Sequence, residues 1–159
     1  MITLNLASAD RISDFIITLS RERGDAITNL KLQKLLYYAQ AWFLALNDRE
    51  LFDEDFQAWV HGPVLPSQYH RFKHNEWRPI MDHIAFSGRT GNILVDKHID
   101  AIIDVFGIET ASALEMMTHQ EKPWIYARQG LVPSANSKSI ITKHSMKRFY
   151  RQLASNKEN

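Results

Sequence analysis

Two histidines stand at a spacing that suits metal binding. His70 and His74 are four residues apart, so a helix would place both imidazoles on one face. A zinc site needs at least one more ligand, and a hydrolytic site also needs a nearby base. The zincin pattern has glutamate after its first histidine, whereas Arg71 stands there and Lys73 precedes the second histidine. The local positive charge favours a surface role over the alternative, a metal-dependent hydrolase that uses His70, His74 and another histidine.

The other residue patterns typical of catalysis are missing from the sequence. It has no cysteine and no Gly-x-Ser-x-Gly motif, which leaves nucleophilic catalysis without its usual signals. It also has neither a Walker loop nor a Gly-x-Gly-x-x-Gly motif, and the glycines at 88 and 91 are better interpreted as a turn. We therefore expect no enzymatic activity, no catalytic residue, no metal site and no cofactor.

The composition is typical of one globular domain. The chain has 159 residues, of which 45% are apolar and 23% charged, and this length can bury a core without disulfides. A net charge of +1 gives no general attraction to nucleic acid or to an anionic membrane. Asp10 and Arg11 interrupt the apolar N-terminus, so no signal peptide is predicted and a cytoplasmic location is expected.

One face of the C-terminal segment is basic. Lysines and arginines outnumber acidic residues between Lys138 and Lys157, and one helical face carries His144, Lys147, Arg148 and Arg151. Such a face can contact phosphates, which makes a nucleic-acid-binding regulator the alternative function. A solvated face of an amphipathic helix is the favoured interpretation, so nucleic acid is not the expected partner.

The elements that position these residues are organised by an apolar helix predicted over residues 30–47. From Leu35 to Leu46, Gln40 is the only strongly polar side chain apart from two tyrosine hydroxyls. A helix that is apolar on nearly every face belongs in a core or a membrane, and a bilayer needs roughly 20 apolar residues. We therefore predict a central core helix, capped by Thr28, whose first turns are exposed at Lys31, Gln33 and Lys34.

The segment after this helix predicts a strand and a rigid loop. Residues 56–60 are aromatic and β-prone, so a short strand is expected there. His61-Gly62-Pro63 should end that strand. Pro63 and Pro66 restrict the residues before them, which predicts an extended loop through Val64 and Leu65.

Helical spacing and caps predict the remaining helices. They are expected after Ser8, after Ser67, from Asp96 to Phe106, after Thr110, around Pro123 and from Met146 to Leu153. A β-hairpin is predicted between residues 84 and 95, and residues 2–6 are interpreted as a short edge strand or an ordered lead-in. The fold class is therefore mainly α, a compact single-domain helical fold around a central apolar helix, with a minor short β-hairpin.

Large aromatic residues flank the predicted loop. Their main role is expected to be in the core, and some of them are candidates to line a groove: Trp59, Tyr69, Phe72, Trp77 and Trp124. Aromatic side chains are common anchors of protein interfaces.

Three motifs in order resemble one known family. They are TNLKLQKLLYYAQ at 28–40, AWVHGPVLP at 58–66 and THQEKPW at 118–124, joined by LFDE at 51–54 and by Tyr69, Phe72, Leu114 and Ala127. Over roughly residues 10–130 the chain resembles the Panacea domain, the SocA/GepA-like and often phage-associated group. The resemblance implies an antitoxin that binds a cognate protein toxin directly, and in SocA-like members also an adaptor that delivers the toxin to the protease ClpXP.

The resemblance also sets the expected boundaries and surface. We predict a Panacea domain over residues 1–131, followed over residues 132–159 by a linker and a basic amphipathic helix that packs on the same domain. The partner-binding surface is expected near the glycine–proline loop and the start of the central helix, at Lys31, Lys34, Tyr38, Trp59, His61, Gly62, Pro63, His119 and Trp124.

Overall fold

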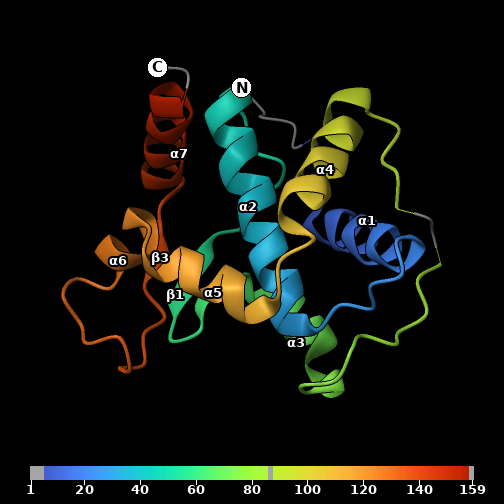
Figure 1. Cartoon of the computed structure of the whole chain (residues 1–159), viewed down its shortest axis with the longest axis horizontal. Helices are drawn as coiled ribbons and strands as arrows, with labels where there is room; N and C mark the ends of the chain where they lie inside the picture. The colour runs from blue at the N-terminus through green and yellow to red at the C-terminus, as the bar shows by residue number, and fades with distance from the viewer. Residues whose placement is uncertain (1–5, 86–87, 158–159) are drawn as a thin grey trace.

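The fold is built around one buried helix, α2 (Asn29–Asn47). The computed structural model describes residues 6–85 and 88–157, and every residue from Lys31 to Ala41 is buried in it. Figure 1 shows α2 between α4 (Ile93–Phe106) on one side and α7 (Lys143–Lys157) on the other. The prediction of a mainly helical fold around a central apolar helix is confirmed.

The other elements surround α2 or extend from its two ends. In chain order they are α1 (Ala9–Glu22), β1 (Phe56–Trp59), β2 (Gly62–Val64), α3 (Pro66–Phe72), the 3-10 helix η1 (Lys73–Asn75), α5 (Ala111–His119), α6 (Lys122–Ala127) and β3 (Ile140–Ile141). In the described part of the chain, no helix is both long and apolar enough to cross a membrane.

Side-chain caps fix where several helices begin. The Thr28 hydroxyl accepts a hydrogen bond from Lys31 N at 3.2 Å, and the Thr110 hydroxyl accepts one from Ala113 N at 3.0 Å. Ser8 caps α1 in the same way. Each cap satisfies an amide that has no partner inside its helix. These three predicted caps are confirmed, as is the position of Pro123 in the first turn of α6.

Two buried glutamines on α2 hold the chain that follows the helix. Gln40 donates from Nε2 to Phe52 O at 2.7 Å and accepts at Oε1 from Leu51 N at 2.8 Å. Gln33 accepts from Leu65 N at 2.9 Å. A buried amide without partners is costly, so these pairings tie the loops to the helix.

The small sheet has the order β2-β1-β3 and both pairings are antiparallel. The strand predicted over residues 56–60 is confirmed as β1. The prediction that Gly62-Pro63 leads into an extended loop is wrong in one respect, because these residues form β2, with Gly62 opposite Trp59. The third strand, β3, lies directly after a segment whose sequence indicated only a polar linker.

The hairpin predicted between residues 84 and 95 is wrong where the structure describes it. Residues 93–95 form the first turn of α4, and Asn92 caps that helix through Val95 N. The helix therefore starts before Asp96, whose carboxylate accepts instead from Thr90 N at 2.9 Å. Phe86 of the predicted hairpin, and residues 2–5 of the predicted lead-in, lie outside the described residues.

Candidate functional site

The β1–β2 turn brings most of the predicted site residues together. Seven of them lie in the hairpin or pack against it: Lys34, Trp59, His61, Gly62, Pro63, His119 and Trp124. Gly62 has a φ of +102°, a conformation that other residues rarely adopt. A tight turn with a left-handed residue holds β2 against β1 and places the turn next to α2 and α5.

Lys34 of α2 holds this turn in place through a hydrogen bond. Its Nζ donates to Pro63 O at 2.9 Å, and none of its side chain is exposed. A Cβ atom added to Gly62 would lie 2.7 Å from Lys34 Cε and 2.9 Å from Thr118 Oγ1. The absence of a side chain at Gly62 therefore makes room for the lysine and for α5.

Burial changes the acid–base behaviour of Lys34. Removal from water disfavours the charged ammonium and lowers the pKa of Lys34 to about 7, and the Glu115 carboxylate acts in the opposite direction. An amine in this state still donates one hydrogen bond to Pro63 O. Because Lys34 is fully enclosed, its role in the structure is that of a hydrogen-bond donor to the turn.

Helices α5 and α6 form the other wall around the turn. His61 Nδ1 lies 2.6 Å from a Glu115 carboxylate oxygen, which joins the tip of the turn to α5. Trp124 donates from Nε1 to Trp59 O at 2.8 Å, and its ring stacks on His119 with 4.1 Å between centroids. Burial is the main cause that lowers the pKa of His119, and it favours a neutral ring beside Lys34.

The predicted exposure of the first turns of α2 is wrong. Gln33 and Lys34 are fully buried, and Lys31 is 8% exposed. Lys31 binds Asp25 Oδ2 and Gly107 O, each at 2.7 Å, so its charge is neutralised by a neighbouring carboxylate. The polar residue types at positions 31, 33 and 34 predicted exposure, because these long-range partners cannot be seen in the local sequence.

Two predicted site residues lie away from the turn. Lys31 joins the α1–α2 connection to the end of α4. Tyr38 donates to Glu121 at 2.6 Å and stacks on Phe106. Glu121 also accepts from Tyr150, so Tyr38 belongs to the contact between α2 and α7.

An open cleft of about 570 Å³ lies beside the turn, and sequence reasoning found only part of it. We call it the hairpin cleft. Its walls come from the start of α2, the β1–β2 turn, the α3–η1 segment and the loop at residues 134–138. Trp59 and Tyr69 stand side by side in it, with 4.9 Å between ring centroids, and both are half-buried.

The remaining members of the aromatic set differ in exposure. Phe72 and Trp124 are buried, as expected for core residues. Trp77 is 77% exposed, so its predicted place in the core is wrong. The cause is that α3 ends at Phe72, so Trp77 lies beyond the helix that was expected to turn it inward.

Arg128 fixes the loop that forms one wall of the hairpin cleft. Its guanidinium is buried, donates to Ala58 O at 2.9 Å and reaches Val132 O at 3.2 Å, Pro133 O at 3.3 Å and also Ala135 O. It also lies over the Trp124 ring at 4.6 Å. Arginine presents five N–H donors on a fixed planar fork, so it can reach carbonyls on two sides at once, whereas the donors of a lysine all lie on one ammonium nitrogen. Nothing in the local sequence around Arg128 signalled this role.

The paired histidines do not assemble a metal site in the described residues. His74 Nε2 lies 2.9 Å from Asp82 in an exposed contact, whereas His70 contacts the ring of Tyr69. Residues 6–85 and 88–157 contain no group of three or more histidine, aspartate or glutamate side chains placed to hold a metal ion. The four-residue spacing of the two histidines was therefore a weak indication of metal binding.

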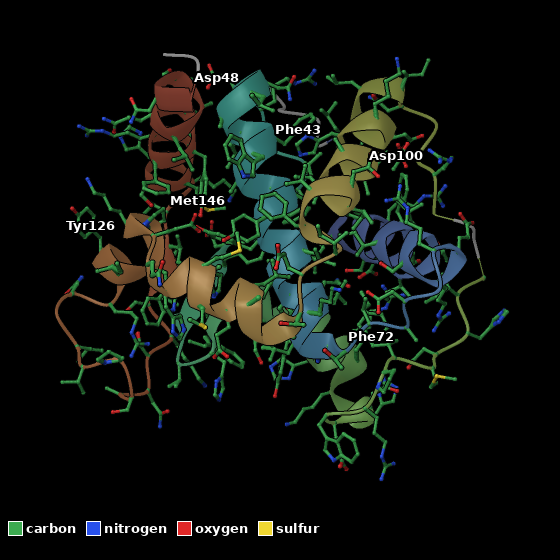
Figure 2. All side chains as sticks on the ribbon, in the orientation of Figure 1. Phe43, Asp48, Phe72, Asp100, Tyr126 and Met146 are labelled. Atoms are coloured by element: carbon green, nitrogen blue, oxygen red, sulfur yellow. The ribbon has the colours of Figure 1, made fainter. Side chains whose placement is uncertain are left out.

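Much of the basic face of α7 is used in contacts within the molecule. Lys143 lies 2.7 Å from Asp55, and Lys147 lies 2.8 Å from Asp48. Arg151 also approaches Asp48, at 3.8 Å. Figure 2 shows Asp48 at the end of α2 beside α7. These ion pairs reduce the positive charge that the face offers to phosphates.

The groups around the turn are suited to recognition. Lys34, Trp124 and the contact between His61 and Glu115 hold the hairpin in place, and the half-buried aromatic residues of the hairpin cleft offer a preformed surface. Ordered loops on a rigid scaffold are a common form of binding site.

Comparison with known proteins gives the family. The family model described as "Antitoxin SocA-like, Panacea domain" matches residues 32–125, from α2 into α6. Antitoxin SocA of Caulobacter vibrioides (strain NA1000 / CB15N) is 49% identical over 110 residues, which cover 62% of this chain and 58% of that protein. The chain thus spans less than two thirds of that relative's length, and no solved structure matches it. On the family match, the chain belongs to the antitoxin SocA-like, Panacea domain family.

Proposed function

We propose that this protein is a non-enzymatic antitoxin that neutralises a cognate protein toxin by direct binding. The observation that carries the proposal is the match of the family over α2, the hairpin, α5 and most of α6, together with 49% identity to a protein named as an antitoxin. The matched segment contains the β1–β2 turn, where most of the predicted partner residues meet.

The rigidity of the turn supports a binding role. Lys34, Gln33 and Arg128 each hold main-chain oxygens or amides of the hairpin or of the loop beside it. A surface that is ordered before binding loses less conformational entropy when a partner docks. This arrangement suits a protein that must capture a toxin tightly.

Co-expression tests the proposal. The protein encoded by the neighbouring open reading frame is expressed alone and together with this chain, and growth and complex formation are measured. We expect growth arrest by the neighbour alone, rescue by this chain, and a complex recovered by size-exclusion chromatography. A harmless neighbour, or continued arrest without a complex, would show that the proposal is wrong.

Delivery to a protease is a second step that we propose from the same resemblance. The half-life of the toxin is measured in cells that express this chain, with and without active ClpXP. We expect a short half-life that lengthens when the protease is inactive. Rescue of growth with an unchanged toxin half-life would leave direct neutralisation as the whole function.

A further inference from the structure

The hairpin cleft is large enough to hold a few residues of a partner. Its volume is about 570 Å³, and pockets of roughly 300–1,000 Å³ are the usual size of binding sites. Figure 1 shows α3 and the loop before β3 on opposite sides of the hairpin, and both segments contribute lining residues. The cleft is therefore framed by two separate segments, with the hairpin and the start of α2 between them.

The floor of the cleft offers mostly apolar contact. Asn29 donates to Tyr69 O at 3.0 Å and accepts from Gln33, which in turn accepts from Leu65 N. These two amides are thus engaged within the protein. Among the apolar groups that line the cleft, the Trp59 and Tyr69 rings and the side chains of Leu30 and Val60 are partly exposed and suit an apolar side chain.

The residues that line the cleft carry a net positive charge. Lys73 comes from η1 and Lys138 from the loop before β3, so the two lysines stand on different walls. Both are exposed, and neither has a carboxylate within 4 Å among the described residues. Glu76 is the only acidic residue among the described residues that line the cleft. Two lysines against one glutamate favour a ligand that carries negative charge.

We propose that the hairpin cleft receives a segment of the toxin in which an apolar side chain is flanked by acidic residues. The apolar group would contact Trp59 and Tyr69, and the carboxylates would lie near Lys73 and Lys138. This inference rests on the proposed antitoxin function. A protein segment is favoured over nucleic acid because the apolar lining of the cleft suits an apolar side chain, and because Lys143 and Lys147 of α7 are paired with carboxylates and add little free positive charge.

Charge reversal with a matched control tests the inference. The cleft variant is Lys73→Glu with Lys138→Glu, and the control is Lys97→Glu with Arg148→Glu, which makes the same change of charge at exposed sites outside the cleft. Thermal melting establishes that both variants are folded. Affinity for the toxin from the neighbouring gene is measured by calorimetry at low and high salt.

We expect the cleft variant to bind the toxin at least about tenfold more weakly than wild type at roughly 50 mM salt, with a smaller difference at high salt, because added ions screen exposed charges. The control should change affinity by less than about threefold. Equal weakening by both variants, or by neither, would overturn the cleft assignment while the antitoxin function stands. Absence of toxin binding by the wild-type protein would instead refute the proposed function.

Cross-linking identifies the occupant directly. A photoreactive amino acid is placed at position 138 in one variant and at position 97 in the control, and each is irradiated with the toxin. Mass spectrometry should recover a toxin peptide rich in aspartate or glutamate from position 138 only. A basic peptide, or cross-linking from position 97 alone, would overturn the inference. So would binding of a labelled 30-nucleotide DNA or RNA that the cleft variant abolishes.

Discussion

At the scale of single residues, the contact between Lys34 and Gly62 holds the turn around which most of the candidate site residues lie. The lysine passes under the turn because Gly62 has no side chain, and it donates to the next carbonyl along the strand. Sequence patterns placed both residues near the site but gave Lys34 the wrong environment. A lysine at the start of a helix is usually solvated, and only the fold shows that this one lies under the hairpin.

Substitution of Gly62 by alanine should be strongly destabilising. The added Cβ would overlap Lys34 Cε at 2.7 Å, and the residue would keep a φ of +102°. Left-handed strain and overpacking together predict a loss of about 3 kcal/mol in the free energy of unfolding. Urea unfolding followed by circular dichroism measures this loss.

Gly130→Ala is the matched control for that experiment. Gly130 also has a positive φ, +78°, but nothing lies within 4 Å of an added Cβ. Its substitution should therefore cost about 1 kcal/mol, from backbone strain alone. Equal losses at both glycines would contradict the tight contact between Gly62 and Lys34.

The lowered pKa of Lys34 predicts that stability depends on pH above neutrality. The pKa of Lys34 is about 7 in the folded protein, whereas the ordinary pKa of a lysine is 10.5, so between these pH values the unfolded chain binds a proton that the folded protein does not. Stability should therefore rise with pH in this window, by up to about 1.4 kcal/mol per pH unit. Burial raises the pKa of Tyr37 and Tyr150, so their contribution should reverse the trend above about pH 10.

Lys34→Met separates this effect from other titrations. The variant keeps a long side chain but has no titratable group. Urea midpoints measured at about pH 7, 8 and 9 should rise for the wild type and stay nearly level for the variant. Parallel pH profiles for the two proteins would show that Lys34 is not the group responsible.

At the scale of elements, side chains from helices determine where the hairpin and its neighbouring loop lie. Gln33 and Lys34 bind β2 and the residue that follows it, and Arg128 binds β1 and the 132–135 loop. The periodicity and caps of the helices were readable from sequence because they depend on residues three or four positions apart. The position of the loop that forms one wall of the cleft could not be predicted from the sequence, because it depends on the hydrogen bond from Arg128 to Ala58 O, a residue 70 positions earlier.

The failed hairpin prediction at residues 84–95 has a related cause. The run Ile93-Leu94-Val95 is compatible with either a strand or the start of a helix when only its apolar character is considered. In the structure, Asn92 caps a helix that begins at Ile93. Of the three apolar residues, only Val95 is buried. Short apolar runs are ambiguous until their polar neighbours find partners.

Arg128→Lys should loosen the loop wall while preserving charge. A lysine has one ammonium nitrogen in place of the planar fork, so it could not reach both Ala58 O and the carbonyls of the 132–135 loop with the same geometry. We expect a loss of about 2–3 kcal/mol in the free energy of unfolding, and faster proteolysis within residues 132–138. Arg148→Lys, at an exposed position on α7, is the control and should change neither measurement. An unchanged rate of proteolysis within residues 132–138 in Arg128→Lys would contradict the proposal that Arg128 holds this loop in place.

At the scale of the whole molecule, the C-terminal helix belongs to the same core as the family segment. The family match ends at residue 125, yet Tyr150 of α7 is fully buried and donates to Glu121 at 2.9 Å. Figure 2 places Met146 on the side of α7 that faces the rest of the fold. The basic composition that suggested a separate nucleic-acid-binding role describes only the outer face of this helix.

This packing predicts that α7 and the rest of the fold unfold together. Met146 is 1% exposed, and Met146→Ala should lower stability by about 2–4 kcal/mol through the cavity it leaves. Arg148→Ala, on the exposed face, should change stability by less than about 0.5 kcal/mol. In native-state hydrogen exchange, the most protected amides of α2 and α7 should lose the same free energy in Met146→Ala, because one cooperative core connects them. If the α7 amides instead exchanged through an opening of lower free energy that left the protection of α2 unchanged, the helix would unfold separately from the rest of the fold.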